Sequence, residues 1–328
     1  MSSLPESSGL LILPRLRIQN ANTISSPMTH GFPSITAFLG LMWALERKLA
    51  DHDQPVGCDS VGVICHGYQQ QVTKDSFVHT FCLTRNPVDK TGGTAAIVEE
   101  GRIHLDITLI FGISGGIVTQ DENMRMKFAQ FVGNTLAQMR VAGGTVLSRP
   151  AEHRWHRPRL ERIPDDATDA HRWFRLLRRS WLPGFALVSR DDLLDRAMER
   201  MRSENPSATK LEAWLNLSRF NWQPHRVEHQ DANTGEITRT TIKWTHDRTE
   251  GWIVPIPVGY GALSELYPSG AVANARGSHT PFRFVESLYS VGQWISPHRI
   301  DSWKKLLWYG DADIHSGLYR ARNDYAFV

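Results

Sequence analysis

The pattern of apolar and polar positions predicts a strand near the start of the chain, whose first half is apolar and whose second half alternates between polar and apolar residues. Residues 10–13 are all apolar. The alternation that follows separates two sets, which are Arg15, Arg17 and Gln19 on one face and Leu16 and Ile18 on the other. Pro14 cannot donate to a strand ladder, so we expect a bulge between the two halves. Two interpretations stay open here: solvated arginines on a half-exposed strand, or a polyanion-binding surface that continues into Asn20 and Asn22.

Two later stretches repeat apolar residues at three- and four-residue steps, which predicts amphipathic helices. The first begins at Pro33 and Ser34 and runs to about Ala50. The second covers residues 123–139. The pair Gly143-Gly144 is expected to stop this helix, because glycine is common just beyond a helix C-terminus.

Further strands are predicted by β-branched and alternating residues at 60–72, 77–83, 94–98, 104–113 and 145–147. In the clearest of them, His104, Asp106 and Thr108 share one face and apolar residues share the other. Between two of the strands lies TRNPVDKTGG at 84–93, which is typical of a turn. These features predict a hairpin arm, or thumb, at about 77–103, with Arg85, Lys90 and Thr91 near its tip.

Residues 9–148 therefore read as strand, helix, strand, arm, strand, helix, strand. This β-α-β-β-α-β order predicts an α+β protein with a ferredoxin-like domain of the RRM/RAMP type and an inserted thumb. In such a domain the two helices cover one face of the sheet. RNA-recognition modules place RNA on the open face, although their aromatic signature is absent from this sequence.

Residues 149–328 are expected to form a helical insertion and a mixed α/β C-terminal region for packing and docking. Helices are predicted at 190–202, capped by Asp191 or Ser189, at 207–220, capped by Ser207, and at 282–295. Residues 222–248 predict an exposed β-hairpin. The segment at 251–260 contains two prolines, which favours an edge strand or an extended packed segment.

The stretch from Arg149 to Arg179 carries nine arginines against five acidic residues, with Trp155, Trp173, Phe174 and Trp181 nearby. Arginines among aromatic residues are typical of nucleic-acid surfaces. They are equally typical of protein docking faces, where Trp and Arg are enriched. Both interpretations remain open.

Composition narrows the possibilities. A chain of 328 residues with 41% hydrophobic and 22% charged residues is a folded globular protein. The net charge is only +3, so any nucleic-acid surface must arise from local segregation of charge. Cys58, Cys65 and Cys82 form no CxxC pair, which predicts neither disulfides nor a zinc site but a reducing, cytoplasmic setting. No segment predicts a signal peptide or a membrane span.

Several catalytic motifs are missing from the sequence, which contains no GxxxxGK[ST], GxGxxG or HExxH. The pairs His153/His156 and His246-Asp247 are expected to be structural or solvated. Glu99-Glu100 beside Arg102 predicts a salt-bridged turn. The best case for catalysis is His66 or His104 as a general acid–base in metal-independent RNA cleavage.

Several segments together resemble a known family. They are LPRLRIQNANTISSP, GGTAAIVEEGRIHLDITL, AGGTVL, LPGFALVSR, GWIVPIPVGYGALS and FRFVESLYSVGQWISPHRI. In order and spacing, from about Leu11 to Trp308, they resemble the RAMP-type subunits that bind the RNA 5′ handle in type I-F CRISPR surveillance (Csy) complexes, which serve antiviral defence.

The resemblance implies a non-catalytic protein without cofactor or metal. It implies that the chain holds the 5′ handle of the CRISPR RNA, pairs with the large subunit at the tail of the complex, and lies next to a backbone subunit. It also implies a position beside the target double-stranded DNA near the PAM, while the guide reads sequence by base pairing.

Carried onto this chain, the resemblance implies an RNA-binding set on three segments and two weaker positions. The set comprises Arg15, Arg17, Gln19, Asn20 and Asn22 on the first strand, Arg85, Asn86 and Lys90 on the thumb, Arg140, Gly143 and Gly144 in a glycine-rich loop, and Arg276 and Arg283. The rival hypotheses are a RAMP endoribonuclease that processes CRISPR RNA and a protein scaffold without RNA contact.

Overall fold

The computed structural model describes residues 3–52, 56–76, 78–85, 88, 91–147, 156–230, 237–247, 251–275, 277 and 279–326. Its first half contains β1 (Gly9–Asn22), β2 (Ile24–Ser26), β3 (Thr29–His30), α1 (Ile35–Asp51), β4 (Gly57–Gln70), β5 (Val72–Asp75), β6 (Val78–Phe81), β7 (Leu83–Arg85), β8 (Ile97–Glu99), β9 (Arg102–Ser114), η1 (Gly116–Thr119), α2 (Glu122–Ala137), β10 (Arg140–Val141) and β11 (Gly144–Leu147). Both predicted helices are present, and Ser34 caps α1 through its side chain as expected.

The second half is also mixed. It contains β12 (Arg159–Arg162), α3 (Ala167–Leu177), η3 (Arg178–Trp181), β13 (Phe185–Ser189), α4 (Asp191–Glu204), α5 (Lys210–Leu217), β14 (Trp222–Gln230), β15 (Ile237–His246), β16 (Trp252–Ala262), β17 (Val285–Ile295), η4 (Pro297–Arg299), α6 (Trp303–Leu306), β18 (Trp308–Asp313) and β19 (Leu318–Asn323). The α+β class predicted from the sequence is therefore confirmed. Among the described residues no helix is long and apolar enough to cross a membrane.

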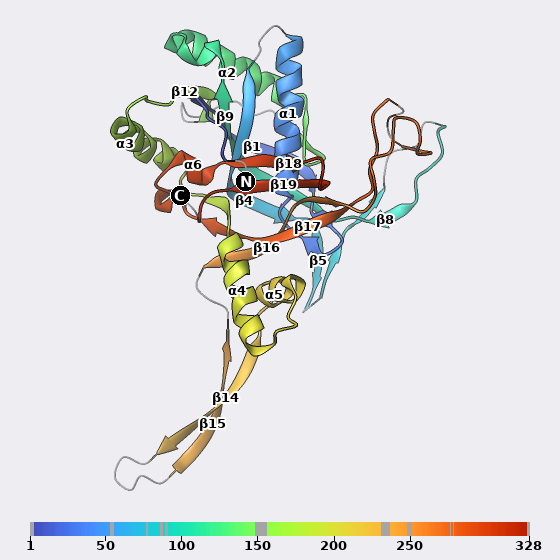
Figure 1. The fold of residues 1–328 in the computed structure, drawn as a ribbon, viewed down its shortest axis with the longest axis vertical. Coiled ribbons are helices and arrows are strands. Elements are labelled where there is room, and N and C mark those ends of the chain that lie inside the picture. Colours follow the sequence, from blue (N-terminus) through green and yellow to red (C-terminus); the bar gives the residue numbers. More distant parts are fainter. Residues whose placement is uncertain are drawn as a thin grey trace.

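One antiparallel sheet joins the two halves (Figure 1). Its strands follow the order β10-β11-β1-β9-β4-β13-β17-β16-β19-β18, and β12 pairs with the first half of β1. Strand β4 also pairs with β18, so the C-terminal strands close a ring on it. The arm predicted as one hairpin at about 77–103 is instead two small separate hairpins, β5–β6 and β7–β8, the first of which begins at Val72. Strands β14 and β15 form the predicted exposed hairpin.

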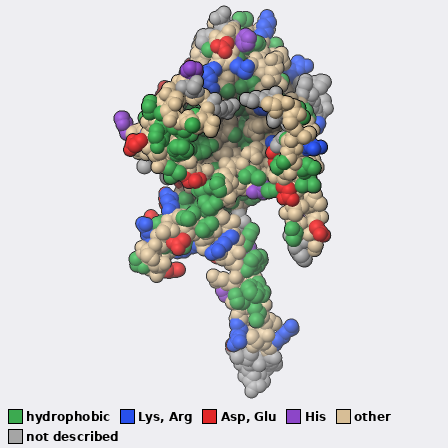
Figure 2. All heavy atoms as spheres, turned by 90° about the vertical axis from the view of Figure 1, so that its right-hand side faces the viewer, with side chains coloured by type: hydrophobic (Ala, Val, Ile, Leu, Met, Phe, Trp, Pro, Cys, Tyr) green, Lys and Arg blue, Asp and Glu red, His purple; other side chains and the backbone are tan. Residues whose placement is uncertain are grey.

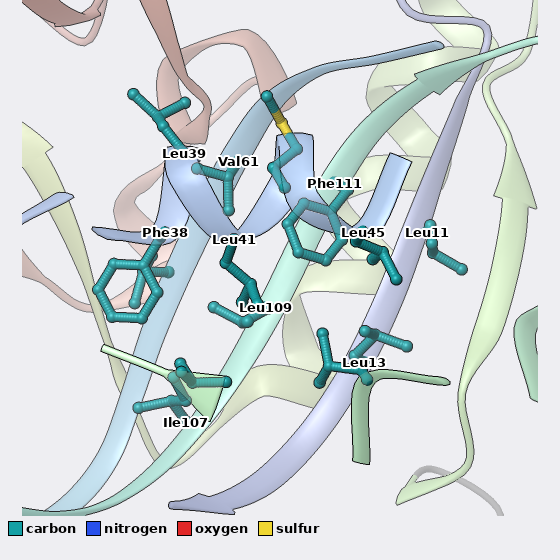
Figure 3. Packing of buried hydrophobic residues seen from close by; sticks show 14 of the residues in the cluster. Leu11, Leu13, Phe38, Leu39, Leu41, Leu45, Val61, Ile107, Leu109 and Phe111 are labelled. Carbon is teal, nitrogen blue, oxygen red and sulfur yellow. The ribbon is translucent and has the colours of Figure 1, made fainter. Parts of the chain in front are cut away.

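The main core lies between this sheet and the helices α1 and α2. Phe38, Leu41 and Leu45 of α1 pack on Leu13 and Leu109 of the sheet (Figure 3). Apolar residues of α2 join the same cluster, which are Phe128, Ala129, Val132 and Leu136. Each fully buried leucine of this kind contributes about 1.5–3 kcal/mol.

A second core covers part of the opposite face. Leu10 and Ile12 of β1 pack there against Phe174 and Trp181, both of which are buried. The face predicted to be open is thus closed over the first half of β1. The Arg- and Trp-rich stretch supplies this cover. The buried Trp181 is therefore part of neither a nucleic-acid surface nor a protein docking face. Trp155 lies outside the described residues.

The predicted bulge at Pro14 is confirmed. The register between β1 and β9 shifts between Leu13 and Leu16, and Arg15 has φ +54°. A second shift lies between Ile18 and Ala21, where Asn20 has φ +57°. Since non-glycine residues rarely adopt this conformation, both positions are held by their surroundings.

Three expectations about helix ends were wrong. Helix α2 ends at Ala137, and Gly143-Gly144 lie instead in the β10–β11 hairpin, where Gly143 belongs to the turn and Gly144 begins β11. Arg190 precedes α4 without a side-chain cap. Thr209, not Ser207, caps α5, in a reciprocal capping box with Glu212.

The predicted helix at 282–295 is the strand β17. It lies inside the sheet with β16 on one side and β13 on the other. A Cβ atom on Gly292 would lie 3.0 Å from side-chain atoms of both Ile256 and Leu187, so the neighbouring strands approach it closely. Pairing on both sides overrides the helical spacing of the apolar residues. The proline half of β16 pairs only with β17, as expected of an edge, but Gly259–Gly261 also pair with β19.

Candidate nucleic-acid interface

The second half of β1 lies in the middle of a polar patch on the sheet. Cross-strand partners point to the same face, and the pairing registers therefore bring residues of five neighbouring strands together. We call this set the polar face; it comprises Arg17 and Gln19 on β1, Thr145 and Leu147 on β11, His104 and Asp106 on β9, Gln69 on β4 and Arg140 on β10. The helices α1 and α2 cover the other side of the same strands.

The two cations of the polar face differ from Arg15, which lies at the bulge. Arg17 is exposed, and its side chain has no hydrogen bond or ion pair within the described residues. Arg140 is also exposed and donates only to the carbonyl oxygen of Gly143, at 3.2 Å. The guanidinium of Arg15, in contrast, lies 3.1 Å from Asp106 Oδ2. Arg17 and Arg140 are therefore the cations available for a phosphate, whereas Arg15 is largely neutralised by its partner.

Asp106 retains one unused acceptor. Its Oδ2 binds Arg15, while its Oδ1 is buried and has no hydrogen-bond partner. A buried acceptor without a donor is unfavourable. Because Oδ1 is closed to solvent, an external donor would reach it only after the side chains around it had moved.

A chain of hydrogen bonds fixes the tautomer of the neutral His66 ring. The backbone N–H of Arg15 donates to Thr108 Oγ1 at 3.2 Å, and His66 Nε2 lies 2.8 Å from the same hydroxyl. His66 Nδ1 lies 2.7 Å from the carbonyl oxygen of Pro183, which only accepts. Nδ1 therefore carries the proton, and Nε2 accepts from Thr108.

Burial lowers the pKa of His66, and the positive charge of Arg15 acts in the same direction, against the bond to Pro183. The neutral imidazole has both nitrogens engaged within the chain. The His66 ring thus connects β1, β4 and β9 to the loop before β13. Neither of its nitrogens is free to act on a substrate. His104 is not paired with it, because its Nδ1 accepts from the backbone N–H of Asn20 at 3.1 Å.

The glycine-rich loop meets β1 directly. Gly144 is packed so tightly that a Cβ atom would lie 2.6 Å from Ile18 Cγ2 and 2.8 Å from Gln19 O. Gly143 has φ +79° and open space around its Cα. Position 144 requires glycine because there is no room for a Cβ atom, and position 143 favours glycine because of its positive φ. The surface of the loop around Gly143 is open.

The two asparagines of the predicted set have different surroundings. The side chain of Asn22 closes a local turn, donating to Ile24 O at 2.7 Å and accepting from Ile24 N at 3.1 Å. Asn20 is exposed at the second bulge. Of this pair, Asn20 has the side chain that is better placed for an external ligand.

A hollow of about 700 Å³ opens where β1 lacks a neighbour. Strand β12 pairs with residues 9–12 and β11 with residues 17–19, so the bulge between them has no partner on that side among the described residues. Its polar lining carries Arg15, Lys127, Gln130, Asn134, His156 and Arg157, with no acidic residue in the described lining. A hollow of this charge suits an anion.

Not every predicted position joins this site. Arg85 lies in β7 on the arm, and Arg283 donates to Ile314 O at 3.2 Å in the C-terminal half. Asn86, Lys90 and Arg276 lie outside the described residues. The sequence pattern indicated the face of His104, Asp106 and Thr108 but not its use. Arg157 was among the nine arginines of the 149–179 stretch, whereas no pattern indicated Lys127.

The other chemical candidates give no constellation. His246 stacks edge-on against Phe220 and Trp222, while Asp247 binds Asn221, so they form no dyad. Arg102 and Glu100 form the predicted salt bridge. Burial raises the pKa of Cys58 to about 12 and of Cys65 to about 11. Within the described ranges no cluster of His, Cys, Asp and Glu could hold a metal.

Comparison with known proteins agrees with the resemblance. The model of the family CRISPR-associated protein (Cas_Csy2) matches residues 11–321. The CRISPR-associated protein Csy2 of Pseudomonas aeruginosa (strain UCBPP-PA14) is 43% identical over 322 residues, which cover 97% of this chain and 96% of that protein. The chain therefore belongs to the Csy2 family of CRISPR-associated proteins, which confirms the type I-F Csy subunit recognised in its sequence.

Proposed function

We propose that this protein is a non-catalytic subunit that holds the 5′ handle of a CRISPR RNA on its polar face. The observation that carries the proposal is the pair of available cations, Arg17 and Arg140, on a sheet surface that no described helix covers. The basic hollow beside the bulge extends the positive surface.

The fold supports a RAMP-type role for residues 9–148. The strand order β11-β1-β9-β4, with α1 and α2 on one face, is the order of a ferredoxin-like domain. The arm formed by β5 to β8 would be the thumb, and Arg85 would contact RNA from it. Residues 149–328 would then serve packing and docking.

Within the complex, the chain would pair with the large tail subunit and adjoin a backbone subunit. It would border the target double-stranded DNA near the PAM. Sequence reading would belong to the guide, through base pairing with the target strand.

Charge reversal at Arg17 tests the proposal in the assembled ribonucleoprotein. The control is Lys48→Glu, which makes the same charge change at an exposed position on α1, on the opposite side of the sheet. We expect Arg17→Glu to release guide RNA at a lower salt concentration than the wild type. The plot of log affinity against log salt should flatten by about 0.7 for one lost phosphate contact on a single strand.

Equal RNA retention by Arg17→Glu and Lys48→Glu would contradict RNA contact at this face. Incubation with repeat RNA addresses the enzyme hypothesis. Metal-independent cleavage that is lost in His66→Ala or His104→Ala would show an endoribonuclease instead.

A further inference from the structure

The hairpin of β14 and β15, which we call the ribbon, projects from the body (Figure 1). Its strand pairing gives it two faces with different side chains. The register Trp222↔His246, Pro224↔Trp244 and Arg226↔Ile242 places these six side chains together. We call this set the aromatic face. The alternate pairs, Gln223↔Thr245 and His225↔Lys243, form the opposite face.

The aromatic face is open to solvent. Trp222 is 57% exposed, Trp244 59% and Ile242 65%. The ring of His246 lies 5.0 Å from Trp222 and 5.2 Å from Phe220, which extends the surface toward the body. Figure 2 shows green hydrophobic side chains continuing from the body along the ribbon.

Such a surface is unusual for a hairpin that has no third strand. An isolated two-stranded ribbon is only marginally stable in water. Two half-exposed tryptophans and an isoleucine on one side of it add unfavourable hydration. Contiguous exposed apolar residues of this kind mark interaction sites.

We propose that the aromatic face docks onto another protein subunit of the complex, on an apolar surface that presents a carboxylate to Arg226. Arg226 lies within the aromatic face, opposite Ile242, and has no ion-pair partner among the described residues. Covering the tryptophans would also remove this guanidinium from water. A desolvated cation requires a carboxylate with good geometry. Glu228, two residues further along the same face, forms no ion pair with Arg226 among the described residues, so the partner is expected to supply the carboxylate.

The distribution of charge disfavours a nucleic acid on the same surface. Platforms for single-stranded nucleic acid combine stacked aromatic rings with cations that follow the backbone on the same side. On the ribbon, Lys243 and Arg239 lie on the opposite face, and Glu228 shares the aromatic face with Arg226. Pro224 and Ile242 are also poor stacking partners for bases.

The first experiment uses site-specific photo-crosslinking in the complete ribonucleoprotein. Benzoylphenylalanine is introduced at Trp244, and at Lys243 as the matched control on the opposite face. We expect a crosslink from position 244 to one protein subunit, in a segment where Asp or Glu lies among aliphatic residues, and none to that segment from position 243. A crosslink from 244 to RNA or DNA, or the absence of any crosslink, overturns the proposal.

The second experiment measures retention of the crosslinked subunit. We expect Trp222→Ala/Trp244→Ala to weaken retention at least tenfold and His225→Ala/Lys243→Ala to leave it near the wild-type value, with unchanged thermal midpoints for both. Arg226→Glu should also weaken retention of the subunit. Replacing the Asp or Glu of the crosslinked segment by Lys should then restore binding to this variant. Equal retention by all variants, or no such rescue, contradicts the inference.

The inference rests on the proposed function, because it assumes a multisubunit complex. Guide RNA is therefore quantified in the same preparations, together with Arg17→Glu. Loss of the subunit only in the aromatic-face variant, with RNA retained by Arg17→Glu, leaves the docking surface standing and removes the proposed RNA contact. Loss of RNA in Arg17→Glu without any effect of the ribbon variants supports the proposed RNA contact and removes the docking surface.

Discussion

The two halves of β1 share a strand and a neighbour but differ in what covers them. Residues 9–13 pair with β9, and their side chains are buried on both faces of the sheet. The half from Arg15 to Asn22 also pairs with β9, but its polar side chains are exposed on the side away from α1 and α2. One strand therefore anchors the core and, a few residues later, presents a polar surface.

The bulge at Pro14 and Arg15 marks the change. It interrupts the register with β9 and lies where neither β11 nor β12 pairs with β1 among the described residues. Proline tolerates this position because it has no N–H to leave unpaired. The difference teaches that burial along a strand is set by what packs on it from far away in the sequence.

The largest effect should come from Leu11→Ala in the buried half. Removing a fully buried leucine side chain leaves a cavity, and we expect a loss of about 2–5 kcal/mol in the free energy of unfolding. Arg17→Ala, in the exposed half, should change it by less than about 0.5 kcal/mol. Urea denaturation of both variants measures this contrast, and similar losses would show that the two halves are equally structural.

The sequence predicted much of the first half of this fold. Alternation placed the polar residues of β1, and apolar spacing located α1 and α2 within a few residues. It could not foresee the second core, because Phe174 and Trp181 reach Leu10 from more than 150 residues away. The same limit explains β17, whose neighbours decide between strand and helix.

The sequence predicted the part of the candidate site that lies on the single strand β1. Arg17 and Gln19 follow from parity alone, and Arg140 follows from the resemblance. The unused oxygen of Asp106 and the locked ring of His66 depend on contacts across β1, β4 and β9. No local pattern reports such contacts, so they emerge only from the tertiary structure.

The two glycines of the glycine-rich loop should differ in how much stability is lost when each is replaced by alanine, and both losses should be smaller than that of Leu11→Ala. Gly144→Ala would press a Cβ atom against Ile18 and against backbone atoms of Gln19 and Ala21, which should cost about 1–3 kcal/mol of stability. Gly143→Ala meets open space and carries only the strain of φ +79°, about 1 kcal/mol. Unfolding measurements separate the two variants, and an order opposite to this one would contradict the packing of the loop on β1.

The smallest expected effect is the pH dependence contributed by His66, which lies next to the bulge between the two halves. Its pKa is lowered in the folded protein by burial and by Arg15, so the unfolded chain binds the proton more strongly. The stability contribution of the neutral ring is complete above the unfolded pKa of about 6.5 and is lost as the pH falls below it.

Comparison with His66→Gln isolates this contribution, because glutamine both donates and accepts but does not titrate. Between pH 8 and pH 5 the urea midpoint of the wild type should fall more than that of the variant. All other histidines are common to both proteins and cancel in the difference. Parallel pH profiles would mean that His66 titrates alike in the folded and unfolded states, which would contradict the burial of a neutral ring between the bulge and the loop before β13.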